Sequence, residues 1–326
     1  MINRRDFLKK GLKYATLGAL GFYSYKAGIS GVIEDIWYLA NVICPLKKPE
    51  NKLLFDQHFH IGEFKKDKLE KIVNEFLDTT DFVTIAIHGI HPTKGEDTYE
   101  GLVKKIKDYK LARIDFSDKY ATIISKEDKR TVLLKGQEVY SLNPNNLKQQ
   151  IHINTLGIDY IREYITSEEL LESVELKDGM ATLNHPFSIP NKYVKFWFPN
   201  SKEEDYLKKL AQDYDIFIET HNMMNVAWMA AANAKAKLLS QSSKRKGLGG
   251  SDAHETSLKH TLNMIGHCGT LLDPSPQIQD LSSLTGKEII QSLAKYIKNS
   301  KIETLDNYAS PWTFYNVMVR RPSVWK

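Results

Sequence analysis

Histidines and carboxylates recur in this sequence in short motifs whose spacing suits metal coordination. His58 and His60 are two residues apart, and side chains two apart on an extended strand point to the same side, so both could reach one ion. Asp252 and His254 repeat that spacing after a glycine-rich run, and Glu138 offers two oxygens that could bridge neighbouring cations. Imidazole together with carboxylate suits Zn²⁺, Mn²⁺ or Fe. The motifs therefore predict a metal centre.

Three further histidines lie in or directly after apolar, strand-like runs: His88, His152 and His185. A histidine on an apolar strand is usually hydrogen-bonded within a core, and this alternative stays open for His88 or His152 taken alone. Six of the ten histidines, however, fall at predicted strand ends beside carboxylates, which favours one shared site. The histidines that we leave outside the ligand set are His91, His221, His260 and His267.

Short β-like runs alternate with longer helical stretches from about residue 52 onward, which predicts an α/β domain with parallel strands. The predicted strands are Leu53–Asp56, Phe82–His88, Thr131–Gln137, Gln150–Thr155, Met180–Asn184, Ile216–Glu219 and Gly247–Gly250. The predicted helices are Lys68–Leu77, Tyr99–Tyr109, Ser167–Leu176, Asp205–Tyr214, Ala227–Leu239 and Gly286–Ile297. In a parallel α/β barrel the carboxyl ends of the strands meet at one face, which is where the candidate ligands fall.

The composition is that of an ordinary globular protein, with 42% hydrophobic and 26% charged residues over 326 positions. The net charge of +5 belongs to the N-terminus, because residues 1–30 contain six basic residues and one acidic residue. The remainder holds 39 residues of each sign and is neutral. This balance predicts no nucleic-acid partner.

Residues 1–30 resemble a twin-arginine export signal, with Arg4-Arg5 followed by Asp6, Phe7 and Leu8 and then a short apolar stretch. A basic amphipathic helix of a cytosolic protein is the alternative. We expect recognition by the twin-arginine export machinery and a location in the periplasm or on the outer face of the cytoplasmic membrane. Residues 31–51 are predicted as a linker with an N-terminal helix. Cleavage, or membrane association through an uncleaved segment, stays open.

Only two cysteines occur, Cys44 and Cys268. They lack the spacing of a thiolate metal pair, which makes thiolate zinc chemistry an unattractive interpretation. One disulfide and two free thiols are both open at this point.

In this order, the motifs resemble the polymerase and histidinol phosphatase (PHP) superfamily of metal-dependent phosphoesterases. The resemblance runs from about Asp56 to His267: His-x-His, His, Gly-x-Glu, His, His-Pro and Ser-Asp-Ala-His. It implies a distorted seven-stranded (β/α)7 barrel over residues 52–326, with two or three divalent metal ions at the carboxyl ends of the strands.

The resemblance also implies how the ligands are shared. One ion would be held by His58, His60, Glu138 and Asp252, and a second by Glu138, His152 and His185. A third would use His88, His254 and an acidic residue shortly after His60. Here the sequence departs from the family, which usually has Ser-Asp-Gly about five residues after the second histidine. Of the two acids in this stretch, Glu63 and Asp67, we prefer Glu63.

Two further positions carry expectations from the resemblance. Glu219 would orient ligand histidines, and His221 would be a phosphate contact. The family's Asp before the histidine at position 88 is replaced by Ile87. The candidates for a general acid are His91 and His221.

The expected activity is hydrolysis of a phosphate ester by metal-activated hydroxide, with a small phosphorylated molecule as substrate. An amidohydrolase or TatD-like metal hydrolase is the alternative, since its opening motif is also similar to Asp56–His60. The Asp252–His254 pair favours the phosphoesterase. A non-catalytic exported metal-binding protein is the third interpretation.

Overall fold

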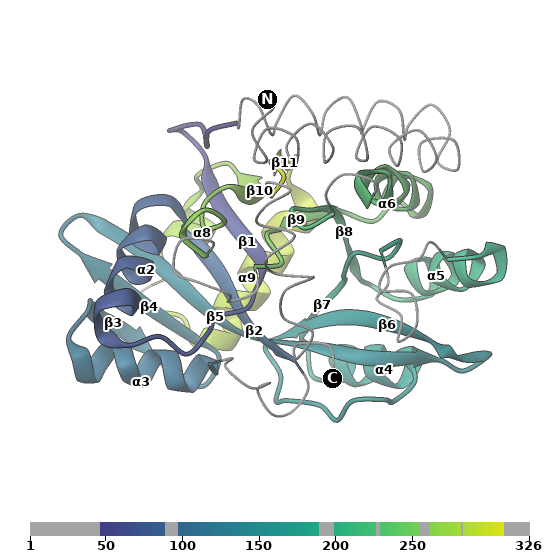
Figure 1. Ribbon diagram of the computed structural model, residues 1–326, viewed down its shortest axis with the longest axis horizontal. Helices are drawn as coiled ribbons and strands as arrows, with labels where there is room; N and C mark the ends of the chain where they lie inside the picture. The colour runs from purple at the N-terminus through teal and green to yellow at the C-terminus, as the bar shows by residue number, and fades with distance from the viewer. Residues whose placement is uncertain are drawn as a thin grey trace, which may run out of the picture.

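A mixed β-sheet of eleven strands forms the centre of the protein (Figure 1). The structure is a computed structural model and describes residues 46–88, 97–188, 199–225, 229–253, 261–281 and 283–309. The strands are β1 (Leu53–Phe59), β2 (Phe82–His88), β3 (Arg113–Ser117), β4 (Ala121–Lys126), β5 (Lys129–Asn143), β6 (Asn146–Leu156), β7 (Met180–Leu183), β8 (Phe217–Asn222), β9 (Gly247–Gly250), β10 (Cys268–Leu272) and β11 (Glu303–Asp306). The helices are α2 (Lys66–Thr79), α3 (Tyr99–Tyr109), α4 (Ser167–Leu176), α5 (Ser201–Asp213), α6 (Ala230–Ser243), α8 (Pro276–Gln279) and α9 (Gly286–Asn299).

Seven strands follow one another in the order β1-β2-β5-β6-β7-β8-β9, with β10 and β11 beyond β1 and the β3–β4 pair attached to β5. The chain after β9 returns to the end of β1. There the amide of Asp252 donates to the carbonyl of His58 at 2.8 Å, and the amide of His60 donates to the carbonyl of Ala253 at 2.9 Å. The seven-strand path is therefore a nearly closed barrel.

All seven predicted strands are present, but the expectation of an all-parallel barrel is wrong at β6. β1, β2 and β5 are parallel, as are β7, β8 and β9, whereas β6 is antiparallel to both β5 and β7. The reason is the short turn between β5 and β6, in which the amide of Asn145 donates to the side chain of Asn143 at 2.9 Å. So short a connection permits only antiparallel pairing. With four additional strands in the sheet, the seven-stranded (β/α)7 architecture is not confirmed.

The helices pack on the sheet through apolar stripes. Helix α2 buries Leu69, Ile72, Val73, Phe76 and Leu77, which is the face that the sequence spacing predicted. Helices α2 and α3 lie on the left in Figure 1 and α4, α5 and α6 on the right. Helices α2 and α3 belong to one apolar cluster and α4 and α5 to another, and α6 contributes to both. Helix α9 closes a third cluster through Ile289, Leu293 and Ile297. The helices thereby leave the carboxyl ends of the strands to polar side chains.

Several predictions lie outside the described residues. They concern the twin-arginine segment, the helix expected within residues 31–51, Cys44, His91 and His254. Cys268 is a free, buried thiol. Among the helices that the structure describes, none has both the length and the apolar character needed to cross a membrane.

Candidate metal centre

Glu138 lies at the centre of a buried cluster of histidines. It is paired with His88, the last residue of β2, in the parallel register of β2 and β5. Five imidazole nitrogens lie within 3.5 Å of its two carboxylate oxygens, and they belong to His58 (3.5 Å), His60 (3.4 Å), His88 (3.3 Å), His152 (3.0 Å) and His185 (3.2 Å). Glu138 is thus placed where a carboxylate could bridge more than one cation.

The two imidazoles of the His-x-His motif lie close together. His58 is the penultimate residue of β1 and His60 follows the strand, and their Nε2 atoms are 3.1 Å apart. The Nε2 atom of His58 lies 3.5 Å from Oδ1 of Asp252, and that of His60 lies 4.0 Å from the same oxygen. His60 also stacks on His88, with ring centroids 4.0 Å apart and an interplanar angle of 7°. Both imidazoles of the motif therefore face the same point.

Asp252 reaches the cluster because the chain turns sharply after β9. Its φ is +48°, in the left-handed region. The side chain of Asn222 donates to Oδ2 of Asp252 at 3.0 Å, which fixes the carboxylate. Gly250 permits this approach, since a Cβ there would lie 2.4 Å from a carboxylate oxygen of Glu219 and 2.7 Å from the Cβ of His58. No residue with a side chain fits at this position without moving its neighbours.

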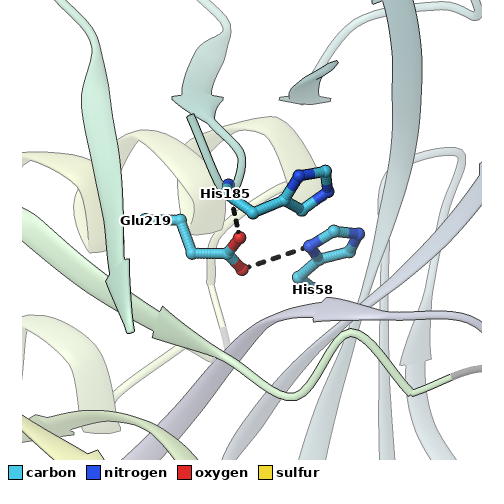
Figure 2. Close-up of side chains that lie close together, drawn as sticks. All are labelled: His58, His185 and Glu219. Carbon is cyan, nitrogen blue, oxygen red and sulfur yellow. Dashed lines mark hydrogen bonds and ion pairs between the residues drawn. The ribbon is translucent and has the colours of Figure 1, made fainter. Parts of the chain in front are cut away.

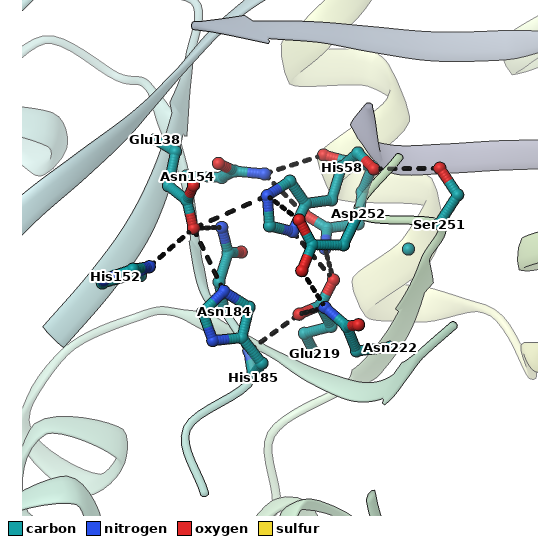
Figure 3. Close-up of polar contacts among 12 residues, drawn as sticks. His58, Glu138, His152, Asn154, Asn184, His185, Glu219, Asn222, Ser251 and Asp252 are labelled. Atoms are coloured by element: carbon teal, nitrogen blue, oxygen red, sulfur yellow. Dashed lines mark hydrogen bonds and ion pairs between the residues drawn. The ribbon is translucent and has the colours of Figure 1, made fainter. Parts of the chain in front are cut away.

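His152 and His185 complete the other side of the cluster (Figure 3). His152 reaches Glu138 from the antiparallel neighbour β6, where it is paired with Tyr140. His185 comes shortly after β7 and has a φ of +25°, so it is a second non-glycine residue of the cluster whose backbone lies in the left-handed region. Asn184 donates to Oε1 of Glu138 at 3.2 Å and keeps the shared carboxylate oriented. The antiparallel β6 therefore contributes a ligand candidate from within the strand rather than from its end.

Glu219 contacts both His58 and His185 (Figure 2), in the position expected of a residue that orients ligand histidines. Its Oε1 lies 3.1 Å from Nδ1 of His58, and its Oε2 accepts the backbone amide of His185 at 2.7 Å. The same carboxylate accepts the side-chain amides of Gln57 at 2.7 Å and Asn222 at 3.0 Å. A carboxylate on the far nitrogen of an imidazole fixes the tautomer and turns the other nitrogen toward the ion site.

The electrostatics of the cluster favour positive charge. Burial alone would lower the pKa of His58, but the carboxylates of Asp252, Glu138 and Glu219 outweigh it and raise that pKa well above its usual value. Burial would likewise raise the pKa of Glu138, yet His58 and His152 bring it well below its usual value. Burial lowers the pKa of His152 despite its contact with Glu138. The carboxylates thus attract cations into a buried space.

Four groups of side chains within the described residues have ligand atoms close enough to share an ion. They are His58–His60–Asp252, His60–His88–Glu138, Glu138–His152–His185 and His58–His185–Glu219. Seven of the nine predicted ligands are brought together in this way. Glu63 is not among them, because its side chain is exposed just after the chain leaves β1. His254 lies outside the described residues, so a third site that uses it stays a prediction.

His221 is turned away from the cluster, so the structure does not support the roles predicted for it as phosphate contact or general acid. It is fully buried, and its Nε2 donates to the carbonyl of Asn307 at 2.8 Å. Its Nδ1 lies 3.3 Å from the side-chain nitrogen of Asn233. The cause is an irregularity in β8, where register shifts between Glu219 and His221. Such a bulge reverses which face the following side chains occupy.

Sequence reasoning missed the amide side chains that hold the ligands, above all Gln57 and Asn154. The side chain of Asn154 donates to the backbone carbonyl of Gln57 at 3.0 Å and to its side-chain oxygen at 3.2 Å. Gln57 in turn donates to Glu219. The only signal in the sequence was an amide residue directly before His58, which is weak by itself.

Comparisons with known proteins yield distant structural likenesses only. No family model and no curated protein matches the chain. A two-domain protein with a predicted PHP-like metal-dependent phosphoesterase from Bacteroides vulgatus is 12% identical, with 81% of this chain and 69% of that chain covered and a TM-score of 0.47. A protein assigned as a metal-dependent phosphoesterase from Bifidobacterium adolescentis is 11% identical (64% and 90% covered, TM-score 0.40). A lesion-specific endonuclease from Pyrococcus furiosus is 16% identical (78% and 57% covered, TM-score 0.46). All three TM-scores are below 0.5, so these likenesses do not establish a family.

Proposed function

We propose that the protein is a metal-dependent hydrolase of phosphate esters, with two or three divalent ions bound around Glu138. The observation that carries this proposal is the convergence of five buried imidazoles on the two oxygens of that carboxylate. Histidine and carboxylate ligands without thiolates suit zinc, manganese or iron.

The orientation of His58 supports cation binding within the cluster. Its Nδ1 faces Glu219, so a neutral ring has its proton on that nitrogen and its lone pair on Nε2. The Nε2 lone pair then faces Glu138 and Asp252, each with an oxygen 3.5 Å away. Lone pairs and carboxylates that face one another repel unless a positive charge lies between them. In the metal-free protein a proton serves this purpose, which is why the pKa of His58 is raised.

The residues of the cluster would have different roles in such a site. Divalent ions held there would lower the pKa of a bound water and neutralise phosphate oxygens. Glu138 would keep neighbouring cations at a fixed separation, and His60 and His88, stacked in parallel, would present their nitrogens at one rim. Glu219 and Asn222 hold His58 and Asp252 in place, so little reorganisation is needed when substrate binds.

We further propose a small phosphorylated compound as substrate, because the neutral body of the chain has no basic tract for a polyanion. The N-terminal motif supports export through the twin-arginine route, which would place this chemistry outside the cytoplasm.

The test combines metal analysis with hydrolysis of p-nitrophenyl phosphate and bis-p-nitrophenyl phosphate by the full chain. We expect at least two ions per chain and turnover of one of the esters. Glu138→Gln should lower the metal content and reduce kcat/KM by at least about 100-fold, since even residues that only support a ligand cost 10–100-fold. His267→Ala, a histidine outside the cluster, is the matched control and should keep both. Metal-loaded protein that cleaves neither ester would contradict the proposal, and one ion or none would favour a non-catalytic role.

A further inference from the structure

His152 and His58 are held in different ways, although both face Glu138. Nδ1 of His152 lies 3.0 Å from Oε1 of Glu138 (Figure 3). In His58 the nitrogen that does not face Glu138 has the carboxylate of Glu219 3.1 Å away. Within the part of the chain that the structure describes, no hydrogen-bond partner lies at the corresponding nitrogen of His152, Nε2. Ligand imidazoles almost always have such a partner, which fixes the ring. The orientation of His152 therefore depends on its other contacts.

The ring of Tyr140 packs on the imidazole of His152. Their centroids are 4.3 Å apart and their planes are inclined by 32°. His185 approaches the same imidazole edge-on, with centroids 4.9 Å apart and an interplanar angle of 74°. Aromatic rings at such separations attract one another in tilted and edge-to-face arrangements. Because His185 is itself a candidate ligand and Tyr140 is not, the contact with Tyr140 supports His152 whether or not an ion is bound.

Tyr140 also lies beside His88, with ring centroids 5.8 Å apart and an interplanar angle of 54°. His88 and His152 belong to different candidate ion groups, and the two groups share Glu138. Tyr140 follows Glu138 by two residues on β5, so both side chains are on the same face of the strand. Loss of the Tyr140 ring should therefore weaken first the ion group that contains His152, since that imidazole is the nearer one.

The backbone of β5 is held on both edges at Tyr140. On one edge Tyr140 is paired with His152 of β6. On the other edge β2 has already ended at His88, and the amide of Tyr164 donates to the carbonyl of Tyr140 at 2.8 Å. Tyr164 makes this contact with a φ of +62°, which is rare for an aromatic residue. The strand that carries the Tyr140 ring is therefore fixed beside the cluster.

We propose that Tyr140 is a positioning residue of the metal centre, whose ring holds the imidazole of His152 in the orientation in which Nδ1 faces Glu138. This inference rests on the proposed function, since it requires an ion bound beside Glu138. The ring does for His152 by packing what Glu219 does for His58 by hydrogen bonding. The planar ring, rather than the phenol hydroxyl, is the part of Tyr140 that acts.

A titration of the metal-free full chain with Zn²⁺ tests this role. His152→Ala identifies the binding step that depends on His152, because that step is lost in this variant. Tyr140→Leu removes the ring, and we expect the affinity of the same step to fall by about 10-fold, the lower end of the range for residues that orient a ligand. Tyr140→Phe keeps the ring and should bind Zn²⁺ as tightly as the unmodified chain.

Two controls separate this role from a general loss of stability. Tyr160→Leu is the matched variant, because Tyr160 is also partly buried but its ring centroid lies 4.0 Å from Nζ of Lys135, and its Zn²⁺ affinity should be unchanged. Urea denaturation of each metal-free variant gives the unfolding free energy. A residue that only stabilises the fold would lower that free energy without weakening Zn²⁺ binding by the folded chain. Tyr140→Gln is a second variant without the ring, for use if Tyr140→Leu does not fold, and it should show the same loss of affinity.

The other outcomes have distinct meanings. Unchanged Zn²⁺ affinity in the folded variants without the ring would overturn the inference alone. An equal loss in Tyr140→Phe would overturn it as well, because the hydroxyl and not the ring would then act. If the unmodified chain binds no Zn²⁺, the proposed metal centre fails and this inference with it. A chain that shows the expected loss in Tyr140→Leu but cleaves neither ester would refute the proposed hydrolysis and leave the inference standing.

Discussion

Two histidines in this protein, His58 and His221, are both completely buried beside carboxylates and amides, yet they occupy different chemical settings. One nitrogen of His58 is held by Glu219 and the other faces carboxylates and another imidazole. His221 has a backbone carbonyl at Nε2 and the side chain of Asn233 at Nδ1. The partners of each nitrogen, rather than burial or a nearby acid, distinguish a candidate ligand from a histidine that holds the fold together.

The largest effect should come from the residue that turns His58 toward the cluster. Glu219→Gln replaces an acceptor-only carboxylate with an amide whose nitrogen would face a donor at either oxygen position, Gln57 at Oε1 or Asn222 at Oε2. We expect metal affinity to fall by about 10–100-fold, measured by titration of the apo protein with Zn²⁺. Unchanged affinity would show that the orientation of His58 does not depend on Glu219.

An intermediate effect is expected two residues further along β8. His221→Asn leaves the carbonyl of Asn307 without its buried donor, and the unfolding free energy should fall by about 1–3 kcal/mol. Urea denaturation measures this loss. Metal content per folded chain should be unchanged, and a loss of metal would erase the contrast between the two histidines.

A pH-dependent effect is expected for Asp56, a buried carboxyl near the cluster that accepts hydrogen bonds from backbone amides. Burial raises its pKa to about 7, although it accepts the amides of Ser251 and His58. Between about pH 4 and 7 the folded state holds this proton while the unfolded state has lost it, so the contribution of Asp56 to stability falls as pH rises. The slope should be at most about 1.4 kcal/mol per pH unit, the limit for a single proton.

Asp56→Asn removes this pH-dependent contribution to the unfolding free energy. In the metal-free protein, the difference in unfolding free energy between the unmodified chain and Asp56→Asn should therefore shift in favour of the variant from pH 4 to pH 7. A difference that does not vary with pH would mean that Asp56 is ionised throughout.

The sequence predicted the strands and most candidate ligands because both depend on local patterns. Apolar runs ending in polar residues identify strands, and ligand spacing such as that of His58 and His60 survives when the strand stays regular. Strand direction has no such pattern, so the reversal of β6 was missed. The resemblance implied that His221 is a phosphate contact, but the register shift in β8 between Glu219 and His221, which turns His221 away, has no sequence pattern either.

The closure of the barrel has a consequence for how the protein is made. The hydrogen bond from the amide of Asp252 to the carbonyl of His58 joins the first and last of the seven strands, and both side chains belong to one candidate ion group. A growing polypeptide cannot complete that group until residue 252 has left the ribosome and docked. Metal binding at this group would then require a completed barrel. The bound ion would also stabilise the contact between the two ends of the barrel against unfolding.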